Sequence, residues 1–339
     1  MSRRRSNKSR VERYELARSP LAQKPTQKEL AALLGLKKGQ LRGVISHKEM
    51  YTVRRIQVSG NKTRHLIFPR GKLRELHERL KFHLNKIKQP PYVQSPRVGR
   101  AQRDNALIHA GQRQFFLFDI KQFYPSTSSE HVFRWARYEL GMSDDVAGLL
   151  CALVTTDNQL FFGSPATPVL ATLLHRRMFD EIYMECTRRG LKMSIWVDDV
   201  VISGKYITGN FISSVRDIVR RYGLKSHKLQ MKSGDRAVLI TGIPLRGGVV
   251  SPPMNLHWRI RSGYRALAEA DTEDELEAAA GRLLSALGTL RYTVGRASDL
   301  GRRTAGRMAG LRQRRTKLLR NDRVGDARPS CPSSDDPPF

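Results

Sequence analysis

Cysteine and long apolar runs are scarce in this sequence. Its 339 residues include three cysteines, at positions 151, 186 and 331, without any CxxC or Cys/His grouping. This argues against a disulfide framework or a zinc site and favours a reducing, cytoplasmic compartment. No stretch approaches the ~20 apolar residues of a membrane span, and no apolar segment follows the basic N-terminus as in a signal peptide. We therefore predict a cytoplasmic protein with no membrane partner.

Acidic residues are also few compared with basic ones. The chain has 61 Lys+Arg against 31 Asp+Glu, which gives a net charge of +30. A surface this positive favours a polyanionic partner, because each basic residue set against a phosphate releases a condensed counterion. The composition indicates a nucleic-acid-binding protein, although charge alone leaves open a basic protein of the ribosomal kind. The 40% hydrophobic content argues against a disordered chain, and the length favours two or three subdomains.

Hydrophobic patterning predicts a mixed chain of helices and strands. Helices are expected over 30–36 (after a Thr26–Glu29 capping box), 72–87, 131–140, 145–154, 168–189 and 211–222, and again after Pro253. Strands are expected over 51–69 with a turn at 59–62, and over 114–120, 193–197, 200–203 and 237–245. Residues 1–25 are basic and polar, as in an arm that orders on RNA. The stretch 301–323 carries nine Arg and Lys residues, Arg312 and Arg315 among them, interleaved with apolar residues that would anchor a phosphate-facing helix. The alternative for this stretch is a solvated face.

Three aspartates stand at strand ends. Asp119 follows the apolar run Phe115–Phe118, and Asp198-Asp199 separate two apolar runs as at the tip of a hairpin. Ionised carboxylates brought within ~4 Å of each other repel by about 4 kcal/mol per pair at an effective dielectric near 20. Magnesium removes that penalty because it prefers oxygen ligands. Asp-Asp is also ordinary turn chemistry, and adjacent strand residues point apart, so Asp119 and Asp198 are the firmer candidates.

Several motifs resemble those of reverse transcriptases. Phe118-Asp119-Ile120-Lys121-Gln122-Phe123-Tyr124-Pro125-Ser126 looks like the first catalytic motif, Gly163-Ser164-Pro165-Ala166-Thr167-Pro168 like the G-[AS]-P-x-[ST]-P loop, and Trp196-Val197-Asp198-Asp199 like the (Y/F)xDD box. Asn105-Ala106-Leu107-Ile108-His109 and Ile240-Thr241-Gly242 resemble the NAxxH and VTG motifs of the retron type. The resemblance runs from about residue 27 to residue 267, and the motifs occur in the family's order.

The resemblance implies an α+β, right-hand polymerase fold. Its parts would be fingers, a palm with an antiparallel sheet flanked by helices, and a helical thumb. Carried onto this sequence, they give a basic arm over 1–25, fingers over 26–113, a palm over 114–250 with a fingers segment at about 138–165, a basic thumb over 251–325 and a disordered tail over 326–339.

The resemblance also implies roles for individual residues. Asp119, Asp198 and Asp199 would bind two Mg²⁺ ions, with the Ile120 carbonyl as a further ligand. Residues expected to contact the incoming nucleotide are Arg64, Tyr124, Gly163, Ser164 and Lys228. The Tyr124 ring would clash with a ribose 2′-OH, although it could equally be a core aromatic. Residues expected either to recognise RNA or to support the fold are Asn105, His109, Thr241 and Gly242.

Two positions depart from the family pattern. Trp196 stands where Tyr or Phe is usual, and Phe162 where Gln commonly precedes G-[AS]-P. Both positions lie near the primer and template in the family. The departures therefore bear on nucleotide preference, fidelity and robust activity.

The function that follows is RNA-directed DNA synthesis of retron type. Its partners would be dNTPs, a cognate structured non-coding RNA that serves as template and primer, and the branched RNA–DNA product. The family further implies antiphage defence with a separate effector protein. The alternatives are a non-retron bacterial reverse transcriptase, either intron-derived or of another defence type, a catalytically silent RNA-binding protein on the same scaffold, and a two-metal nuclease.

Overall fold

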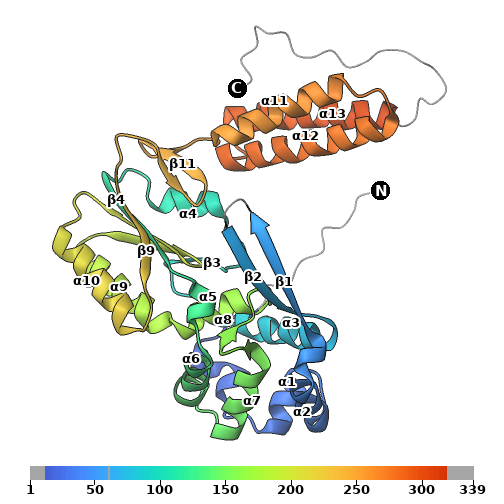
Figure 1. Cartoon of the computed structure of the whole chain (residues 1–339). Helices are drawn as coiled ribbons and strands as arrows, with labels where there is room; N and C mark the ends of the chain where they lie inside the picture. The colour runs from blue at the N-terminus through green and yellow to red at the C-terminus, as the bar shows by residue number, and fades with distance from the viewer. Residues whose placement is uncertain (1–11, 60–61, 319–339) are drawn as a thin grey trace. The chain divides into compact units, whose positions relative to one another are not determined.

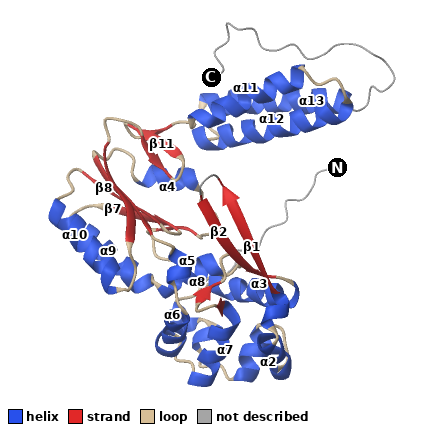
Figure 2. Cartoon of the chain, in the orientation of Figure 1, coloured by secondary structure: helices blue, strands red, loops and turns tan. Residues whose placement is uncertain are grey.

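The chain forms two compact units in the part that the computed structural model describes, residues 12–59 and 62–318. The first unit comprises the described residues up to Arg100, with Phe116–Ile202 and Ile207–Gln230. The second comprises Ala101–Phe115, Ser203–Tyr206 and the described residues from Met231 onward. Each unit has its own hydrophobic core, and Figures 1 and 2 show their helices and strands. The assignment of segments to fingers, palm and thumb stays a prediction, and the predicted tail lies outside the described residues.

Residues 12–25 are packed, so the prediction that the basic arm extends to residue 25 is wrong. They form two short 3-10 helices, η1 (Leu16–Arg18) and η2 (Pro20–Ala22). Leu21 is fully buried, and Tyr14 pairs with Ile87. A few apolar side chains therefore hold a segment whose composition is otherwise basic. Residues 1–11 of the predicted arm lie outside the described residues.

Most of the first unit consists of short helices, and strands make up a smaller part. Its helices are α1 (Gln27–Leu33), α2 (Lys38–Ser46), η3 (Lys48–Tyr51), α3 (Gly71–Asn85), α5 (Phe123–Ser126), α6 (Ser129–Arg134), the π-helix η4 (Trp135–Glu139), α7 (Asp144–Val154), α8 (Thr167–Leu174), α9 (Arg176–Arg188) and α10 (Gly209–Arg221). The predicted capping box begins α1, where the Glu29 N–H donates to Thr26 Oγ1 and the Thr26 N–H donates to the Glu29 carboxylate.

The expected single helix over 168–189 is wrong, because the chain breaks at His175. This residue has φ −101° and ψ 15°, and it separates α8 from α9. Its imidazole is buried, with Nε2 2.9 Å from Thr127 Oγ1. A buried polar side chain that needs a partner outside the helix thus accompanies the change of direction.

A five-stranded sheet carries the predicted acidic residues. The strand order is β3-β7-β8-β4-β9, and β3 and β7 are parallel. The strands are β3 (Val93–Ser95), β4 (Gln114–Ile120), β7 (Lys192–Trp196), β8 (Asp199–Gly204) and β9 (Ser226–Ser233). The bounds of β4 match the prediction, since its run of buried Phe residues reads as a buried strand. β9 was not predicted, because it is a sheet edge whose residues are mostly exposed and carry no apolar alternation.

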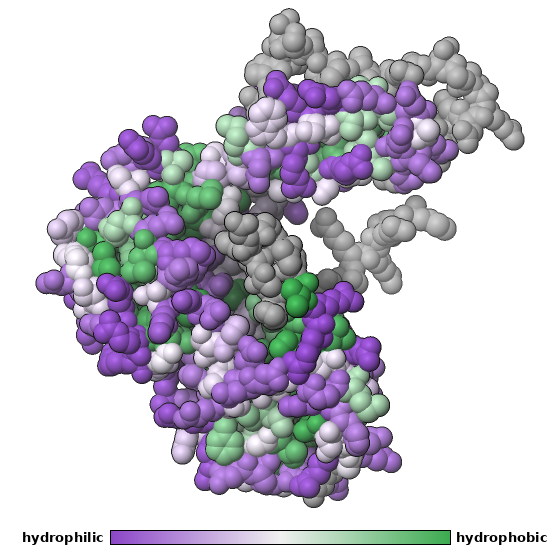
Figure 3. Space-filling view, viewed as in Figure 1, coloured by the Kyte–Doolittle hydropathy of each residue, from purple (hydrophilic) through white to green (hydrophobic). Residues whose placement is uncertain are grey.

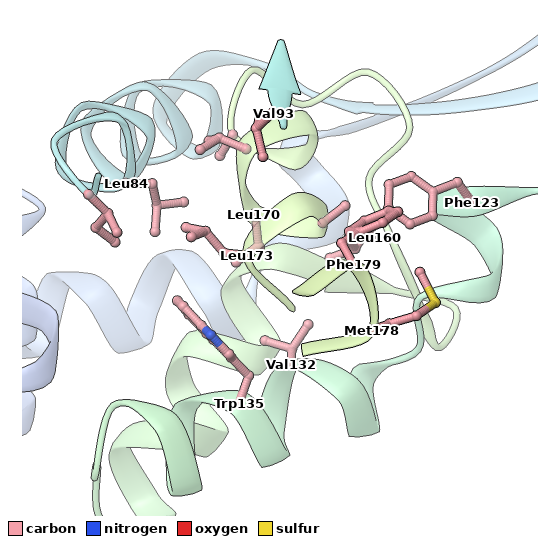
Figure 4. Close-up of a cluster of buried hydrophobic side chains, with 14 of the residues drawn as sticks. Leu84, Val93, Phe123, Val132, Trp135, Leu160, Leu170, Leu173, Met178 and Phe179 are labelled. Carbon is pink, nitrogen blue, oxygen red and sulfur yellow. The ribbon is translucent and has the colours of Figure 1, made fainter. Parts of the chain in front are cut away.

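Two hairpins complete the first unit. β1 (Thr52–Ser59) and β2 (Lys62–Pro69) pair antiparallel, as the strand-like pattern with a turn near 59–62 predicted. β5 (Thr155–Thr156) and β6 (Gln159–Leu160) form a short second hairpin. The core beside them joins several helices. In Figure 4, Leu84 of α3, Val132 of α6, Leu173 of α8 and Phe179 of α9 converge on one buried cluster.

The second unit combines a small sheet with three long helices. Its elements are α4 (Gln102–Ile108), β10 (Val238–Ile240), β11 (Ile243–Arg246), β12 (Val249–Val250), α11 (Met254–Ala268), α12 (Glu273–Val294) and α13 (Asp299–Leu318). The strands β10, β11 and β12 are antiparallel neighbours, and each contacts α4. The expected single strand over 237–245 is wrong, because a turn at Thr241-Gly242 folds it into a hairpin.

The helices α11, α12 and α13 pack around their own apolar core, which includes Leu256, Ile260, Leu283 and Leu287. The side of these helices visible in Figure 3 is largely hydrophilic. None of the helices in the described part is long and apolar enough to span a membrane.

Candidate active site

The sheet brings the predicted acids together. Asp119 is the penultimate residue of β4, Asp198 lies in the turn between β7 and β8, and Asp199 begins β8. Strands β8 and β4 are neighbours, and the Ile120 N–H donates to the Asp198 carbonyl at 3.0 Å. The backbone therefore joins the residue after Asp119 directly to Asp198. Two motifs far apart in the sequence meet at one point of the sheet.

Three residues beside these acids have a left-handed backbone. Gln122 has φ 48°, Val197 has φ 62° and Lys228 has φ 48°. This region is rarely occupied by residues with a side chain, and least by a β-branched one such as Val197. All three residues line one cavity of about 890 Å³. Backbone strain of this kind concentrates at functional sites, where the surrounding structure maintains it.

The cavity is lined by both acidic and aromatic side chains. Its lining includes Asp119, Asp198, Tyr124, Phe162, Trp196, Gln159, His227 and Lys228. The sequence prediction missed Gln159 and His227, since neither belongs to a motif. The walls thus combine groups that can hold cations with rings that can contact a sugar or a base.

The carboxylates influence one another electrostatically. Burial raises the pKa of Asp198, and the nearby Asp119 charge raises it further. The pKa of Asp199 is raised to about 6 by partial burial and then by Asp198 and Asp119, although Asp199 keeps contact with solvent. Like charges near each other disfavour ionisation. The cluster would therefore be stabilised by a positive charge.

Lys228 supplies one such charge. Its ammonium lies 2.5 Å from Asp119 Oδ2, and this bond raises the Lys228 pKa. The lysine is 60% exposed, whereas the Asp119 side chain is 14% exposed. Asp119 Oδ1 is buried and has no hydrogen-bond partner among the described residues. A buried carboxylate oxygen without a partner is suited to an external ligand.

The oxygen ligands of these neighbouring acids are of the kind that a divalent cation prefers, but their side chains do not form a complete set of metal ligands. In the described part of the chain, no three His, Cys, Asp or Glu side chains are grouped so that they could hold a metal ion. The orphan oxygen of Asp119 and the mutual repulsion of the acids favour a cation. The ammonium of Lys228 occupies the other Asp119 oxygen. Lys228 would have to leave before both oxygens became available.

Tyr124 lies on the short helix α5, five positions after Asp119. Its side chain is half-buried, and burial raises the pKa of its hydroxyl, as does the Asp198 charge. The Tyr124 and Phe162 rings meet edge to face, with centroids 5.7 Å apart and planes at 76°. The sequence analysis identified both residues separately, but their contact follows from the tertiary structure.

The Gly163-Ser164 loop is fixed to the first unit from two sides. The Gly163 N–H donates to the Ile67 carbonyl of β2 at 3.1 Å. A Cβ at Gly163 would lie 2.6 Å from Phe68 Cβ, so this position requires glycine. Ser164 is buried, and its Oγ lies 2.6 Å from Nδ1 of the buried His77. The Ser164 hydroxyl is therefore engaged within the protein.

His77 is a residue that the sequence prediction missed. It lies on α3, its Nε2 is 2.9 Å from the Leu153 carbonyl, and it is fully buried. Donation from Nε2 to that carbonyl leaves Nδ1 to accept from Ser164. A histidine among apolar helix positions carries no motif, so only the tertiary contact reveals its connection to the loop.

The retron-type motifs meet in the second unit. Asn105 Nδ2 donates to Thr241 Oγ1 at 3.3 Å, and His109 Nδ1 lies 2.7 Å from Ser203 Oγ. The Asn105 and His109 side chains are both fully buried. Thr241 (φ 46°) and Gly242 (φ 85°) form the two-residue turn between β10 and β11. The two buried side chains thus make contacts within the second unit, and whether they also serve RNA recognition stays a prediction.

The remaining predicted residues are basic. The side chains of Arg64, in β2, and of Arg315, in α13, lie outside the described residues. Arg312 is on α13 and is exposed. Their predicted contacts with nucleotide and RNA stay predictions.

Comparison with known proteins gives two similar sequences, and both are named as retron reverse transcriptases. The retron Mx65 reverse transcriptase of Myxococcus xanthus is 25% identical over 291 residues, covering 77% of this chain and 66% of the relative. The retron Ec86 reverse transcriptase of Escherichia coli is 25% identical over 122 residues, covering 36% of this chain and 38% of the relative. The chain thus spans just under two thirds of the first relative's length. No family model matches the chain.

Among solved structures, telomerase from Candida albicans in complex with a fragment of telomeric RNA aligns with a TM-score of 0.44 and 10% identity. The alignment covers 81% of this chain and 61% of the telomerase chain.

Proposed function

We infer that this chain, a relative of retron-type reverse transcriptases, is an RNA-directed DNA polymerase. One observation carries the proposal: Asp119 and Asp198, from two separate motifs, meet through the Ile120–Asp198 backbone bond beside one cavity. The same cavity holds Tyr124 at the spacing expected of a sugar-contacting ring. The right-hand arrangement of fingers, palm and thumb is part of this proposal.

Two Mg²⁺ ions would be held by Asp119, Asp198, Asp199 and the Ile120 carbonyl. When bound, they would activate a primer hydroxyl and stabilise the departing pyrophosphate. The unpartnered Asp119 oxygen and the raised pKa of Asp199 support this assignment. Lys228, released from Asp119, would be free to approach the nucleotide phosphates.

The remaining side chains of the cavity would orient the substrate. The Tyr124 ring would exclude a ribose 2′-OH and so favour dNTPs, because its half-buried position limits its freedom to move aside. The fixed Gly163 loop would bring backbone close to the nascent base pair. Arg64 would contact the triphosphate, since a guanidinium matches phosphate oxygens in bidentate fashion.

The RNA template is the partner class that the net charge of +30 and the two relatives support. We further propose that the RNA is a cognate structured non-coding RNA that provides both template and primer. The product would then be a branched RNA–DNA molecule, made in the cytoplasm. A role in antiphage defence with a separate effector belongs to the same proposal.

A second candidate function is RNA binding without catalysis. It is favoured by the bond between Lys228 and Asp119, which occupies one oxygen of the predicted catalytic acid. The two candidates make the same prediction for RNA binding and opposite predictions for nucleotide incorporation.

An experiment on Asp198 separates them. We expect Asp198→Asn to abolish dNTP incorporation on an RNA template while the Kd for that RNA stays within about twofold of the parent, because the isosteric amide removes one charge. Asp217→Asn, on the exposed face of α10, is the matched control and should keep parental activity. An inactive parent that binds RNA tightly would favour the silent RNA-binding protein. Equal incorporation by Asp198→Asn and the parent would overturn the catalytic assignment.

A further inference from the structure

Phe162 is presented to the cavity by a rigid loop. The preceding residue, Phe161, is fully buried, its carbonyl accepts from Thr167 Oγ1 at 2.7 Å, and its ring meets His77 edge to face. The following residue, Gly163, is bonded to β2. Phe162 itself is 37% exposed and lines the cavity. Since both neighbours are anchored, the backbone of Phe162 is held at the cavity wall, where its ring meets that of Tyr124.

Tyr124 is half-buried against the core of the first unit, and its ring also contacts a residue of a separate loop. It lies on α5, a helix of four residues that follows the left-handed Gln122. Its ring contacts Phe123, the preceding residue, and Phe162, which comes from the separate loop. Among the residues that the structure describes, the contact with Phe162 is the one ring contact that ties Tyr124 to a different element. Loss of that contact would free the tyrosine to take other side-chain rotamers.

A ring excludes a hydroxyl group only if it cannot turn away. Selective sites depend on supporting residues that hold the contacting group within fractions of an ångström. A glutamine, which is common at this position in the family, would present an amide to the cavity. Phenylalanine presents an aromatic edge or face that packs against a tyrosine ring.

We propose that Phe162 is a sugar-selecting residue: by packing edge to face on Tyr124 from an anchored loop, it holds that ring where a ribose 2′-OH would clash. This inference rests on the proposed polymerase function and deepens it. The departure from the family pattern at residue 162 is then part of how this chain discriminates dNTPs from rNTPs.

The test compares dATP with ATP in single-nucleotide extension opposite uridine in an RNA template. We expect Phe162→Leu to lower the dATP/ATP ratio of kcat/KM by about two- to tenfold, the range that an aromatic pair contributes beyond its buried area. Tyr124→Val should lower the ratio further. The double variant should match Tyr124→Val within about twofold, because Phe162 acts through the tyrosine. Phe82→Leu, at an aromatic residue that is 54% exposed and outside the cavity lining, is the matched control.

The outcomes separate this inference from the function on which it rests. A Phe162→Leu variant that loses dATP and ATP incorporation in equal proportion would mean that the ring only packs. Effects of Phe162→Leu and Tyr124→Val that multiply would mean that the two residues act independently; either result overturns the proposal. Incorporation that persists in Asp198→Asn would instead contradict the proposed function, whatever the sugar ratio.

Discussion

The Lys228 ammonium lies 2.5 Å from Asp119 Oδ2, which links the exposed edge strand β9 to the acid of β4. Lys228 takes a left-handed backbone conformation there, with φ 48°. The other oxygen of the same carboxylate, Oδ1, is buried and has no partner among the described residues. One acid thus has one oxygen bound to a cation of the chain and one buried oxygen with no partner among the described residues.

This arrangement makes Lys228 a competitor for metal. We expect Lys228→Gln to bind Mn²⁺ more tightly than the parent, by up to about fivefold in Kd, because an exposed ion pair contributes about 0.2–1 kcal/mol. Electron paramagnetic resonance of free Mn²⁺ measures the Kd without relying on catalysis. Lys232→Gln, on the same strand, removes the same charge and should leave the Kd near the parental value. A higher Kd for Mn²⁺ in Lys228→Gln, with an unchanged Kd in Lys232→Gln, would instead show that Lys228 assists metal binding.

Replacement of Gly163 should strain the loop that carries Phe162. In Gly163→Ala the new Cβ would meet Phe68 Cβ at 2.6 Å, and neither atom is at the end of a flexible chain. We expect a loss of about 1–3 kcal/mol in the free energy of unfolding, as for other overpacked sites, together with a higher KM for dNTP. Urea denaturation and steady-state extension measure the two effects. Gly209→Ala is the control, because a Cβ there has no neighbour within 4 Å; similar losses in both variants would contradict the contact with Phe68.

The buried His77 should make stability depend on pH. Burial lowers its pKa to about 4, despite opposing effects from the Leu153 carbonyl and Glu78. An unfolded histidine titrates near pH 6.5, so between these values only the unfolded chain takes up the proton, and stability falls as the pH falls. From pH 7.5 to pH 5 this histidine should cost about 2 kcal/mol.

The measurement is urea denaturation at those two pH values. His77→Gln keeps a donor and an acceptor for Leu153 and Ser164, and we expect it to lose about 2 kcal/mol less than the parent over this range. The buried His175, whose pKa burial lowers to about 3, will still contribute to the remaining slope. His47→Gln, at an exposed histidine, serves as the control. Parallel pH profiles for the parent and His77→Gln would refute the prediction.

The turn between β10 and β11 allows a paired test of strain and hydrogen bonding. Both turn residues have positive φ, as in a type I′ turn, which favours Asn-Gly over Thr-Gly. Thr241→Asn relieves the strain of a β-branched residue and offers its own Oδ1 as an acceptor to the Asn105 amide, so it should raise the free energy of unfolding by up to about 1 kcal/mol. Thr241→Val keeps the branched shape but leaves the buried Asn105 amide without its acceptor. We expect it to lower the free energy of unfolding by about 1–2 kcal/mol. Thermal unfolding compares the two, and unchanged stability in both variants would mean that neither strain nor the bond to Asn105 matters.

Much of the local structure could be predicted from the residues alone. The buried run before Asp119 predicted β4 with its observed bounds, and the apolar runs around Asp198-Asp199 predicted the hairpin of β7 and β8. These predictions succeed because a buried strand needs a run of apolar residues, which is visible in consecutive positions of the sequence. The motifs also identified the retron-type resemblance, which agrees with the two relatives.

Where the chain turns was harder to predict. The break at His175 has no Gly or Pro to mark it; it accompanies a bond to Thr127. The turn at Thr241-Gly242 puts a β-branched residue where turns seldom accept one. At both points a contact with a distant residue accompanies a departure from local preference.

By itself, the sequence determined a basic α+β chain with three acids in motifs that resemble those of a polymerase, because composition and hydrophobic periodicity can be read from residues close together in the chain. Only the tertiary structure decided that Lys228 binds Asp119, that Phe162 packs on Tyr124 and that Asn105 supports Thr241. The two residues of each pair lie far apart in the sequence, and no hydrophobic period links them. Which residues meet is decided by the order of the strands in the sheet and by the polar groups that still lack a hydrogen-bond partner once the strands are paired.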